Sequence, residues 1–286
     1  MSNNPFLVET EWLLAHLDDP NVSIVDASWY LPTMLMNGEP RNGKAEYEAQ
    51  HIPGAVYFDI DNISEPGSDL PHTLASPEIF AKMVGALGIS DDDTIVVYDG
   101  MGLFSAARAW WNFRVMGASK VVLLNGGLPK WIADRMPVEA GSAPIYPKLF
   151  KTNFDPSAVT SFEEMNRIVG SAERQIADAR PADRFTGDAP EPRTGMRSGH
   201  MPGANSVPFS ALAKDGQLRS ADELKQVFQS AGIDLAKPVV TTCGSGVTAA
   251  ALTLALETIG HREHTLYDGS WAEWGGRDDT DVVTGK

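Results

Sequence analysis

The chain has 286 residues, of which 43% are hydrophobic and 21% are charged, and its formal net charge is -15. This length is enough for one large globular domain or for two ordinary ones. The negative charge opposes non-specific binding to nucleic acid, and no apolar run is long enough to span a membrane, so we expect neither partner.

The chain contains one cysteine, and its first residues show no basic region followed by an apolar signal core. A single cysteine cannot form an intramolecular disulfide, which is typical of a protein in a reducing compartment. A secretory signal would need the charged start and the apolar core. We therefore expect a cytoplasmic protein.

Short apolar strands alternate with helical patterns along the chain. Apolar residues at helical spacing predict helices over 78–87 and 221–231, with start signals at Ser76-Pro77 and Ser220. Two further segments are apolar almost all round, as buried helices are. Strands are expected within 23–27, 94–100, 175–179 and 239–244, and the buried helices over 105–116 and 249–259. This alternation predicts an α/β fold with a largely parallel sheet, whose functional loops lie at the carboxyl ends of the strands.

The chain reads as two copies of one pattern. The motif His51-Ile52-Pro53-Gly54-Ala55 recurs as His200-Met201-Pro202-Gly203-Ala204, and other landmarks recur at a similar offset of roughly 150 residues. We expect a first domain over 1–140, a proline-rich linker over 141–158 and a second domain over 159–286. The repeated residues are interpreted as structural, and the tryptophans as packing residues. These are His51, His200, Asp26 and Asp178, with Trp131, Trp271 and Trp274.

Cys243 is the candidate nucleophile. It follows the apolar run 239–242, and a glycine-containing loop separates it from the helix expected over 249–259. At a helix N-terminus, unpaired backbone N–H groups and the helix dipole favour negative charge, so a thiol held there is expected to ionise and act as a nucleophile. The alternative is a buried small hydrophobe, the usual role of a free cysteine. The first copy has Asp99 at the equivalent position, so we interpret the first domain as non-catalytic.

Taken together, these motifs resemble the two-domain rhodanese-type sulfurtransferases. The resemblance covers nearly the whole chain and is carried by both His-x-Pro-Gly-Ala motifs, by Cys243-Gly244-Ser245-Gly246-Val247-Thr248 and by Tyr267-Asp268-Gly269-Ser270-Trp271. The cysteine loop is similar to that of 3-mercaptopyruvate sulfurtransferases. Thiosulfate sulfurtransferases typically carry Arg and Lys after the cysteine, where this chain has Gly244 and Ser245. The resemblance implies two tandem rhodanese-like domains, each with a mostly parallel sheet flanked by helices.

The same resemblance implies an activity. Sulfur would pass from 3-mercaptopyruvate to Cys243 as a persulfide, with release of pyruvate, and then to cyanide or to a thiol acceptor such as thioredoxin or a low-molecular-weight thiol. The loop residues Gly244, Gly246, Val247 and Thr248 would cradle the sulfur. For Thr248 the alternative is the N-cap of the following helix. No cofactor or metal is expected, because no Cys/His spacing suggests a zinc site and no phosphate loop is present.

Arg184 and Arg193 match the substrate-binding arginines of the family. A guanidinium group suits a planar carboxylate through paired hydrogen bonds. The alternative is that both are surface residues paired with Asp188 or Glu191. Arg197, nearby in the sequence, is expected to be a solvated surface residue.

A proton relay is implied at Ser245, His72 and Asp61, because a Ser–His–Asp arrangement has been proposed beside the cysteine in the mercaptopyruvate members. A histidine oriented by a carboxylate can move a proton through a serine hydroxyl. The alternative is that Asp61 caps a turn and His72 is an exposed loop histidine.

Three rival functions remain open at this point. Thiosulfate:cyanide sulfur transfer is the nearest. A cysteine phosphatase would need an arginine six positions after the nucleophile, where this chain has Ala249. A non-enzymatic sulfur carrier or interaction module is the third.

Overall fold

The computed structural model describes residues 4–142, 144–171 and 173–285, and it divides into two compact units. The first unit comprises Met1–Pro66, Leu74–Asp155 and Asp215–Leu218. The second unit comprises Gly67–Thr73, Pro156–Lys214 and Arg219–Lys286. The main division, after Asp155, falls inside the stretch expected as a linker. Each unit also includes one short segment that the sequence places in the other half.

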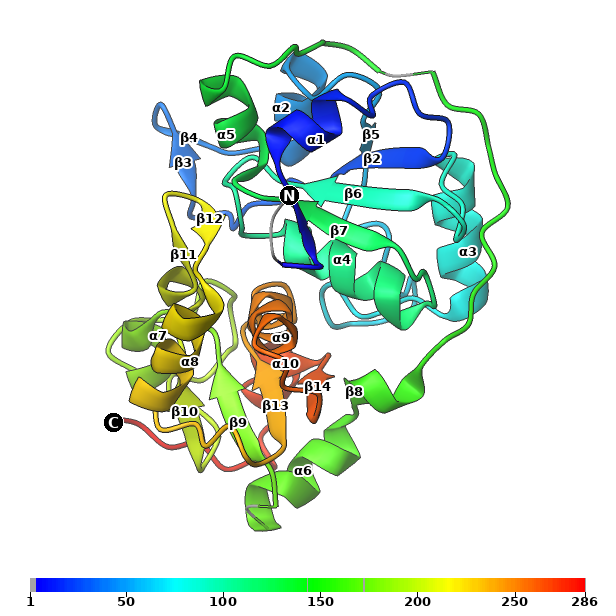
Figure 1. The fold of residues 1–286 in the computed structure, drawn as a ribbon. Coiled ribbons are helices and arrows are strands. Elements are labelled where there is room, and N and C mark those ends of the chain that lie inside the picture. Colours follow the sequence, from blue (N-terminus) through cyan, green and yellow to red (C-terminus); the bar gives the residue numbers. More distant parts are fainter. Residues whose placement is uncertain (1–3, 143, 172, 286) are drawn as a thin grey trace. The chain divides into compact units, whose positions relative to one another are not determined.

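The first unit is built on a five-stranded parallel sheet with the strand order β1-β7-β6-β2-β5 (Figure 1). Its strands are β1 (Leu7–Val8), β2 (Val22–Asp26), β5 (Val56–Tyr57), β6 (Thr94–Tyr98) and β7 (Val121–Leu124). Its helices are α1 (Thr10–Leu14), α2 (Gly43–Ala49), α3 (Pro77–Ala86), α4 (Ala106–Val115) and α5 (Gly127–Ala133). A small antiparallel hairpin joins β3 (Leu35–Met36) to β4 (Glu39–Pro40).

Apolar side chains cover both faces of this sheet, since successive residues of a strand point to opposite faces. One cluster joins α1, α2 and α5 to the sheet and includes Leu13, Ile24, Tyr47, Val96, Tyr98 and Trp131. The helices α3 and α4 lie on the other side (Figure 1). There an aromatic cluster comprises Phe58, Phe80, Phe113 and Phe150. Trp131 is therefore a core residue, as predicted.

The second unit repeats the architecture with the strand order β10-β9-β13-β14-β8, again parallel. Its sheet strands are β8 (Val159–Thr160), β9 (Gln175–Asp178), β10 (Ala204–Ser206), β13 (Val239–Thr242) and β14 (His264–Tyr267). Its helices are α6 (Phe162–Ser171), α7 (Ala182–Thr186), α8 (Ala221–Ser230), α9 (Ala249–Thr258) and α10 (Ser270–Trp274). Short elements are the 3-10 turns Pro156–Ala158 and Phe209–Ala211 and the strand β11 (Ala213–Lys214), whereas β12 (Gln217–Leu218) belongs to the first unit. Trp271 and Trp274 are buried in its core, as predicted.

The predicted α/β fold class is confirmed, and the expected helices begin and end within two residues of the observed ones. At α8 the start signal acts as expected, because Ser220 Oγ accepts from Glu223 N and the Glu223 side chain accepts from Ser220 N. At α3 the side chain of Ser76 makes no capping hydrogen bond, and Pro77 opens the helix instead.

His51 and His200 are buried, as expected for structural residues. His51 Nδ1 lies 2.7 Å from the backbone oxygen of Tyr47, and His200 Nδ1 lies 2.8 Å from that of Phe185. Each histidine also stacks on the ring of that same aromatic residue. The repeated motif thus anchors equivalent turns in the two units.

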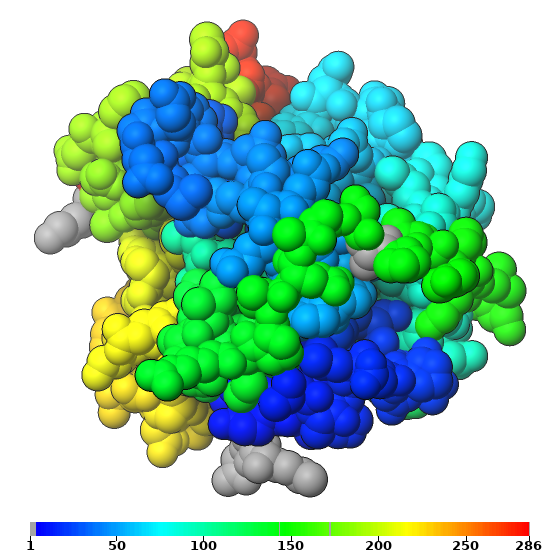
Figure 2. Space-filling model, turned by 90° about the horizontal axis from the view of Figure 1, so that it is seen from above, coloured from blue at the N-terminus to red at the C-terminus, as the bar shows by residue number. Residues whose placement is uncertain are grey.

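Residues 144–155 form a strap on the first unit. The backbone N–H of Lys148 donates to Gly85 O at 2.9 Å, and that of Asn153 donates to Met116 O at 2.9 Å. A Cβ on Gly85 would lie 2.6 Å from Lys148 O, so the close approach requires a glycine. In Figure 2 this green segment runs over the surface among the blue and cyan residues of the same unit. The carboxyl-terminal part of the expected linker is therefore not a free tether.

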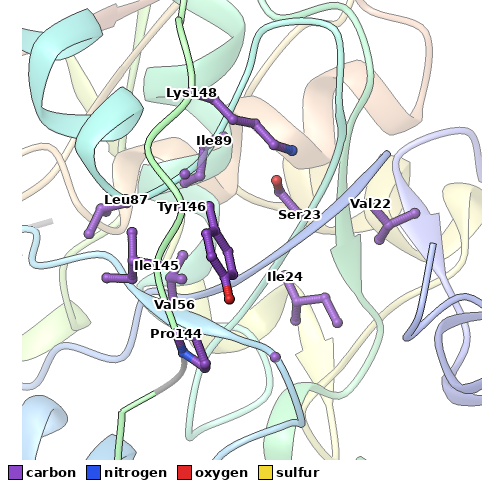
Figure 3. A pocket seen from close by; sticks show the side chains of 12 residues that line it. Val22, Ser23, Ile24, Val56, Leu87, Ile89, Pro144, Ile145, Tyr146 and Lys148 are labelled. Atoms are coloured by element: carbon purple, nitrogen blue, oxygen red, sulfur yellow. The ribbon is translucent and has the colours of Figure 1, made fainter. Parts of the chain in front are cut away.

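A pocket of about 150 Å³ lies beside the strap (Figure 3). Val22 and Tyr146 line it, and so does Lys148, whose Nζ lies 2.7 Å from Asp93 Oδ2. Ser23 Oγ donates to the same carboxylate oxygen at 2.7 Å. Because Val22 begins β2, the pocket lies at the amino ends of the strands, whereas α/β proteins carry function at the carboxyl ends. The pocket is therefore not at the edge of the sheet where a catalytic site is expected.

The longest helices of the described residues have ten residues, or about 15 Å, which is half the thickness of a bilayer core. Within these residues no helix is long and apolar enough to cross a membrane. The same part of the chain contains no group of three or more His, Cys, Asp or Glu side chains that could hold a metal ion.

Candidate active site

Cys243 begins the loop that joins β13 to α9, as the sequence predicted. Its side chain is a buried free thiol. Cys243 N donates to Ser270 Oγ at 3.3 Å, and Trp271 N donates to Cys243 O at 2.9 Å. Ser270 is buried and has a left-handed φ of 51°, which costs of order 1 kcal/mol or more for a residue other than glycine. The start of α10 thus fixes the backbone of the thiol residue.

Gly244 lies against both predicted substrate-binding arginines. A Cβ built on Gly244 would be 3.2 Å from Arg184 Nη2 and 3.7 Å from Arg193 Nη1. The missing side chain therefore leaves room for two guanidinium groups beside the residue that follows the thiol. Arg184 Nε is buried and has no hydrogen-bond partner in the part of the chain that the structure describes.

Ser245 and His72 are hydrogen-bonded although 173 positions separate them. Ser245 Oγ lies 2.9 Å from His72 Nδ1 and accepts from Arg193 Nη2 at 3.2 Å. Because arginine only donates, the hydroxyl proton of Ser245 is available to His72. His72 is 5% exposed, has a left-handed φ of 63° and belongs to the second unit. The alternative of an exposed loop histidine is therefore wrong.

Asp61, the third residue of the predicted relay, belongs to the first unit. Its Oδ1 accepts from Trp29 Nε1 at 3.0 Å. The turn around it is capped by Asp59, whose Oδ1 accepts from the backbone N–H groups of Asp61 and Asn62. Both the alternative of Asp61 as a turn cap and its place in a relay with His72 stay predictions.

The remaining loop residues complete the turn from strand to helix. Gly246 has a φ of 78°, which glycine adopts without steric cost. Val247 is buried. Thr248 occupies the N-cap position of α9, as the alternative predicted, but its side chain makes no capping hydrogen bond. Contact of these residues with substrate stays a prediction.

Both halves of the chain match the family of rhodanese-like domains, over residues 9–134 and 161–277. The chain belongs to the rhodanese family. The 3-mercaptopyruvate sulfurtransferase of Escherichia coli K12 is 43% identical over 277 residues, which cover 97% of either chain. The mitochondrial thiosulfate/3-mercaptopyruvate sulfurtransferase 1 of Arabidopsis thaliana is 40% identical over 304 residues, covering 99% of this chain and 79% of the plant protein.

A solved structure agrees with these relatives. SseA from Escherichia coli, described as a 3-mercaptopyruvate sulfotransferase with the rhodanese fold, has a TM-score of 0.85 and 42% identity. The match covers 93% of this chain and 98% of that one. The predictions of two rhodanese-like domains and of a sulfurtransferase are confirmed.

The first rhodanese-like domain holds a carboxylate where the second holds the thiol. The Asp99 carboxylate accepts hydrogen bonds of 2.7–2.8 Å from the backbone N–H groups of Met101, Phe104, Ser105 and Ala106. A loop before a helix offers such converging N–H groups to anions. In this domain the chain's own side chain fills that position. That the first domain is non-catalytic stays a prediction.

Two residues behind the arginines were not assigned from the sequence. Glu191 Oε2 accepts from Arg184 Nη2, so the predicted alternative pairing of Arg184 exists together with its place beside the loop. Glu191 Oε1 accepts from Arg180 Nη1 at 2.7 Å, and Arg180 also pairs with Asp178 at 2.7 Å. Burial lowers the pKa of Arg180, but the carboxylates of Asp178 and Glu191 raise it by more, so the net shift of the pKa is upward. In the sequence, basic and acidic residues are interspersed over 178–193, and this pattern was the signal that could have indicated the ion pairs.

Arg197 is not the solvated surface residue that we expected. Its Nη1 donates to Thr280 O at 2.7 Å, its Nη2 donates to Trp274 O at 2.9 Å, and its Nε donates to Gly275 O at 3.2 Å. Two of these carbonyls belong to the end of α10, where helices leave backbone oxygens without internal partners. Arg197 therefore fastens the chain after α10.

Proposed function

We propose that this rhodanese moves sulfur from 3-mercaptopyruvate to a thiol or cyanide acceptor through a persulfide on Cys243. The observation that carries the proposal is the placement of Arg184 and Arg193 beside Gly244. The residues that follow the thiol supply no cation. Cations beside the loop suit a donor whose carboxylate lies apart from its sulfur, and guanidinium groups bind carboxylates through paired hydrogen bonds.

In the first half-reaction the Cys243 thiolate attacks the sulfur of 3-mercaptopyruvate. A sulfur–sulfur bond forms, the carbon–sulfur bond breaks, and its electron pair moves onto carbon to give the enolate of pyruvate. Arg184 and Arg193 hold the carboxylate and stabilise the charge that develops on the enolate oxygen. A proton on carbon then completes pyruvate, and Cys243 is left as a persulfide.

The proton traffic is proposed to use Ser245 and His72. Their hydrogen bond of 2.9 Å supports a path in which the Ser245 hydroxyl relays a proton between the substrate and the imidazole. Asp61 would orient His72 and stabilise its charged form, as the carboxylate of a catalytic triad does.

In the second half-reaction an acceptor thiolate, or cyanide, attacks the outer sulfur of the persulfide and releases the Cys243 thiolate. The loop residues Gly244, Gly246, Val247 and Thr248 are proposed to cradle the persulfide between the two steps. This is covalent catalysis by double displacement. Thioredoxin and low-molecular-weight thiols are the proposed acceptors, and the cytoplasm is the proposed location.

Thiosulfate:cyanide sulfur transfer remains the second candidate, because the name of the Arabidopsis relative includes both donors. The test measures kcat/KM with each donor at the same cyanide concentration, together with pyruvate release and the mass of the intact protein. With 3-mercaptopyruvate we expect pyruvate and a gain of one sulfur atom on Cys243.

Cys243→Ser is the control for the chemistry and should abolish both the mass gain and turnover. Full activity of that variant would disprove the mechanism. A higher kcat/KM with thiosulfate than with 3-mercaptopyruvate would disprove the proposed donor and favour the second candidate.

A further inference from the structure

We propose that Glu191 selects the charge of the sulfur donor: by neutralising and positioning Arg184, it favours a singly charged donor over a doubly charged one. The inference rests on the proposed function, because it concerns how the sulfur donor is bound beside Cys243. Glu191 itself is a positioning residue, since it acts through Arg184.

Glu191 is held between two arginines. Its side chain is only 3% exposed, and both carboxylate oxygens are used, one by Arg184 Nη2 and the other by Arg180 Nη1 at 2.7 Å. A buried carboxylate with a guanidinium group on each oxygen has little freedom to move. Glu191 therefore determines where the guanidinium of Arg184 lies.

Arg180, the residue behind Glu191, is itself held rigidly. Arg180 is 1% exposed, pairs with Asp178 at 2.7 Å and donates to Gly199 O at 2.8 Å. Its guanidinium also lies over the ring of Trp271, 4.2 Å from the ring centroid. Arg180 is thus held from several sides, so Glu191 is anchored to the sheet through β9. Movement of Arg184 away from the loop would break this series of contacts.

The charges of this series cancel. Along the series Asp178, Arg180, Glu191 and Arg184 the charges alternate in sign and sum to zero, so Arg184 offers N–H donors to the sulfur donor with little net positive field. A donor such as 3-mercaptopyruvate carries one negative charge, whereas thiosulfate carries two. Removing the Glu191 charge adds one positive charge near the donor, and a dianion gains twice the Coulomb energy that a monoanion gains. The donor preference must therefore shift toward the dianion.

The test compares Glu191→Gln, Glu191→Asp and the parent protein. Glutamine retains an oxygen for Arg184 but removes the charge, whereas aspartate retains the charge but is too short to bridge both arginines. Glu257→Gln is the matched control, since Glu257 is also a mostly buried, ion-paired glutamate of the same unit. It lies near the far end of α9, about 12 Å along the helix axis from its start.

Binding is measured first, in the Cys243→Ser background where no sulfur transfer occurs. Calorimetry gives the affinities for pyruvate, as the monoanion, and for thiosulfate, as the dianion. We expect Glu191→Gln to raise the ratio of thiosulfate affinity to pyruvate affinity about tenfold, because the added positive charge near the ligand stabilises the dianion more than the monoanion. Glu191→Asp should weaken both ligands with less change in the ratio, and Glu257→Gln should change neither.

Steady-state rates with Cys243 present provide the second readout. The Glu191→Gln protein should show the same shift in the ratio of kcat/KM values, carried by KM. An unchanged ratio in both readouts, or an equal shift in Glu257→Gln, would overturn the role of Glu191. A parent protein whose Cys243→Ser form binds neither anion would also overturn it. A shifted binding ratio without turnover of 3-mercaptopyruvate would instead sink the proposed function alone.

Discussion

A methyl group at position 244 is the most direct test of the site. The φ of Gly244 is not in the left-handed region, so alanine can adopt its backbone conformation, and Gly244→Ala should leave stability within about 1 kcal/mol of the parent. The new Cβ would lie 3.2 Å from Arg184 Nη2, closer than the 3.5–4.0 Å of a relaxed contact. Arg184 must retreat by a few tenths of an ångström, against its bond to Glu191.

The retreat weakens a charge-assisted hydrogen bond to the substrate carboxylate, which is worth about 1.5–3 kcal/mol. Loss of half to all of it lowers kcat/KM with 3-mercaptopyruvate by roughly 5- to 100-fold. Pyruvate release measures the rate, and unfolding in urea checks the fold. Gly170→Ala is the matched control, because a Cβ on Gly170 in α6 meets nothing within 4 Å. An unchanged kcat/KM in Gly244→Ala, with an intact fold, would refute the placement of the arginines.

Three further results are expected. Ser245→Ala removes the hydroxyl that lies 2.9 Å from His72 Nδ1, so kcat for pyruvate release should fall about 100-fold. Ser245→Thr keeps a hydroxyl and should retain part of the parent's kcat. Equal kcat values for Ser245→Ala and the parent would exclude the relay. Asp99→Asn replaces a carboxylate that accepts from four N–H groups, which should cost about 3 kcal/mol of unfolding free energy in urea titrations, and a cost below 1 kcal/mol would contradict the anion cradle. Burial raises the pKa of Asp26 from 3.8 to about 6, so the folded state retains its proton at a pH where the unfolded chain has lost it. Unfolding free energy should therefore fall by about 2.4 kcal/mol as pH rises from 4 to 7, and Asp26→Asn should flatten this loss relative to the parent.

The position of Cys243 was predictable because it depends on local patterns. A β-branched run predicts the strand, an apolar run predicts the buried helix, and a short loop between them can only place the thiol at the carboxyl edge of the sheet. The repeat with Asp99 followed from comparison within the chain. The first inference uses neighbouring residues, whose structure is set by backbone propensity and by the period of the apolar positions, and the second needs only that the two copies keep the same order of motifs.

The supporting contacts were not predictable in the same way. Thr248 and Ser76 stand at N-cap positions, yet neither side chain caps its helix, because loop geometry decides where a hydroxyl points. Arginine is a residue type that is usually exposed, but Arg197 donates to backbone carbonyls at the end of α10. Glu191 bridges two arginines that pattern alone cannot orient. Each outcome depends on tertiary approach between segments distant in sequence.

The segment Gly67–Thr73 has a consequence for how this protein can be divided. It lies within the first half of the chain but belongs to the second unit, and Asp215–Leu218 makes the reverse exchange. A cut after Asp155 would leave the cysteine-bearing fragment without His72, the hydrogen-bond partner of Ser245. Neither fragment would inherit a whole unit, so expression, circular permutation or transplantation of the second half alone would yield an incomplete catalyst. The half that has no thiol supplies part of the other's structure, and for that reason it cannot be discarded.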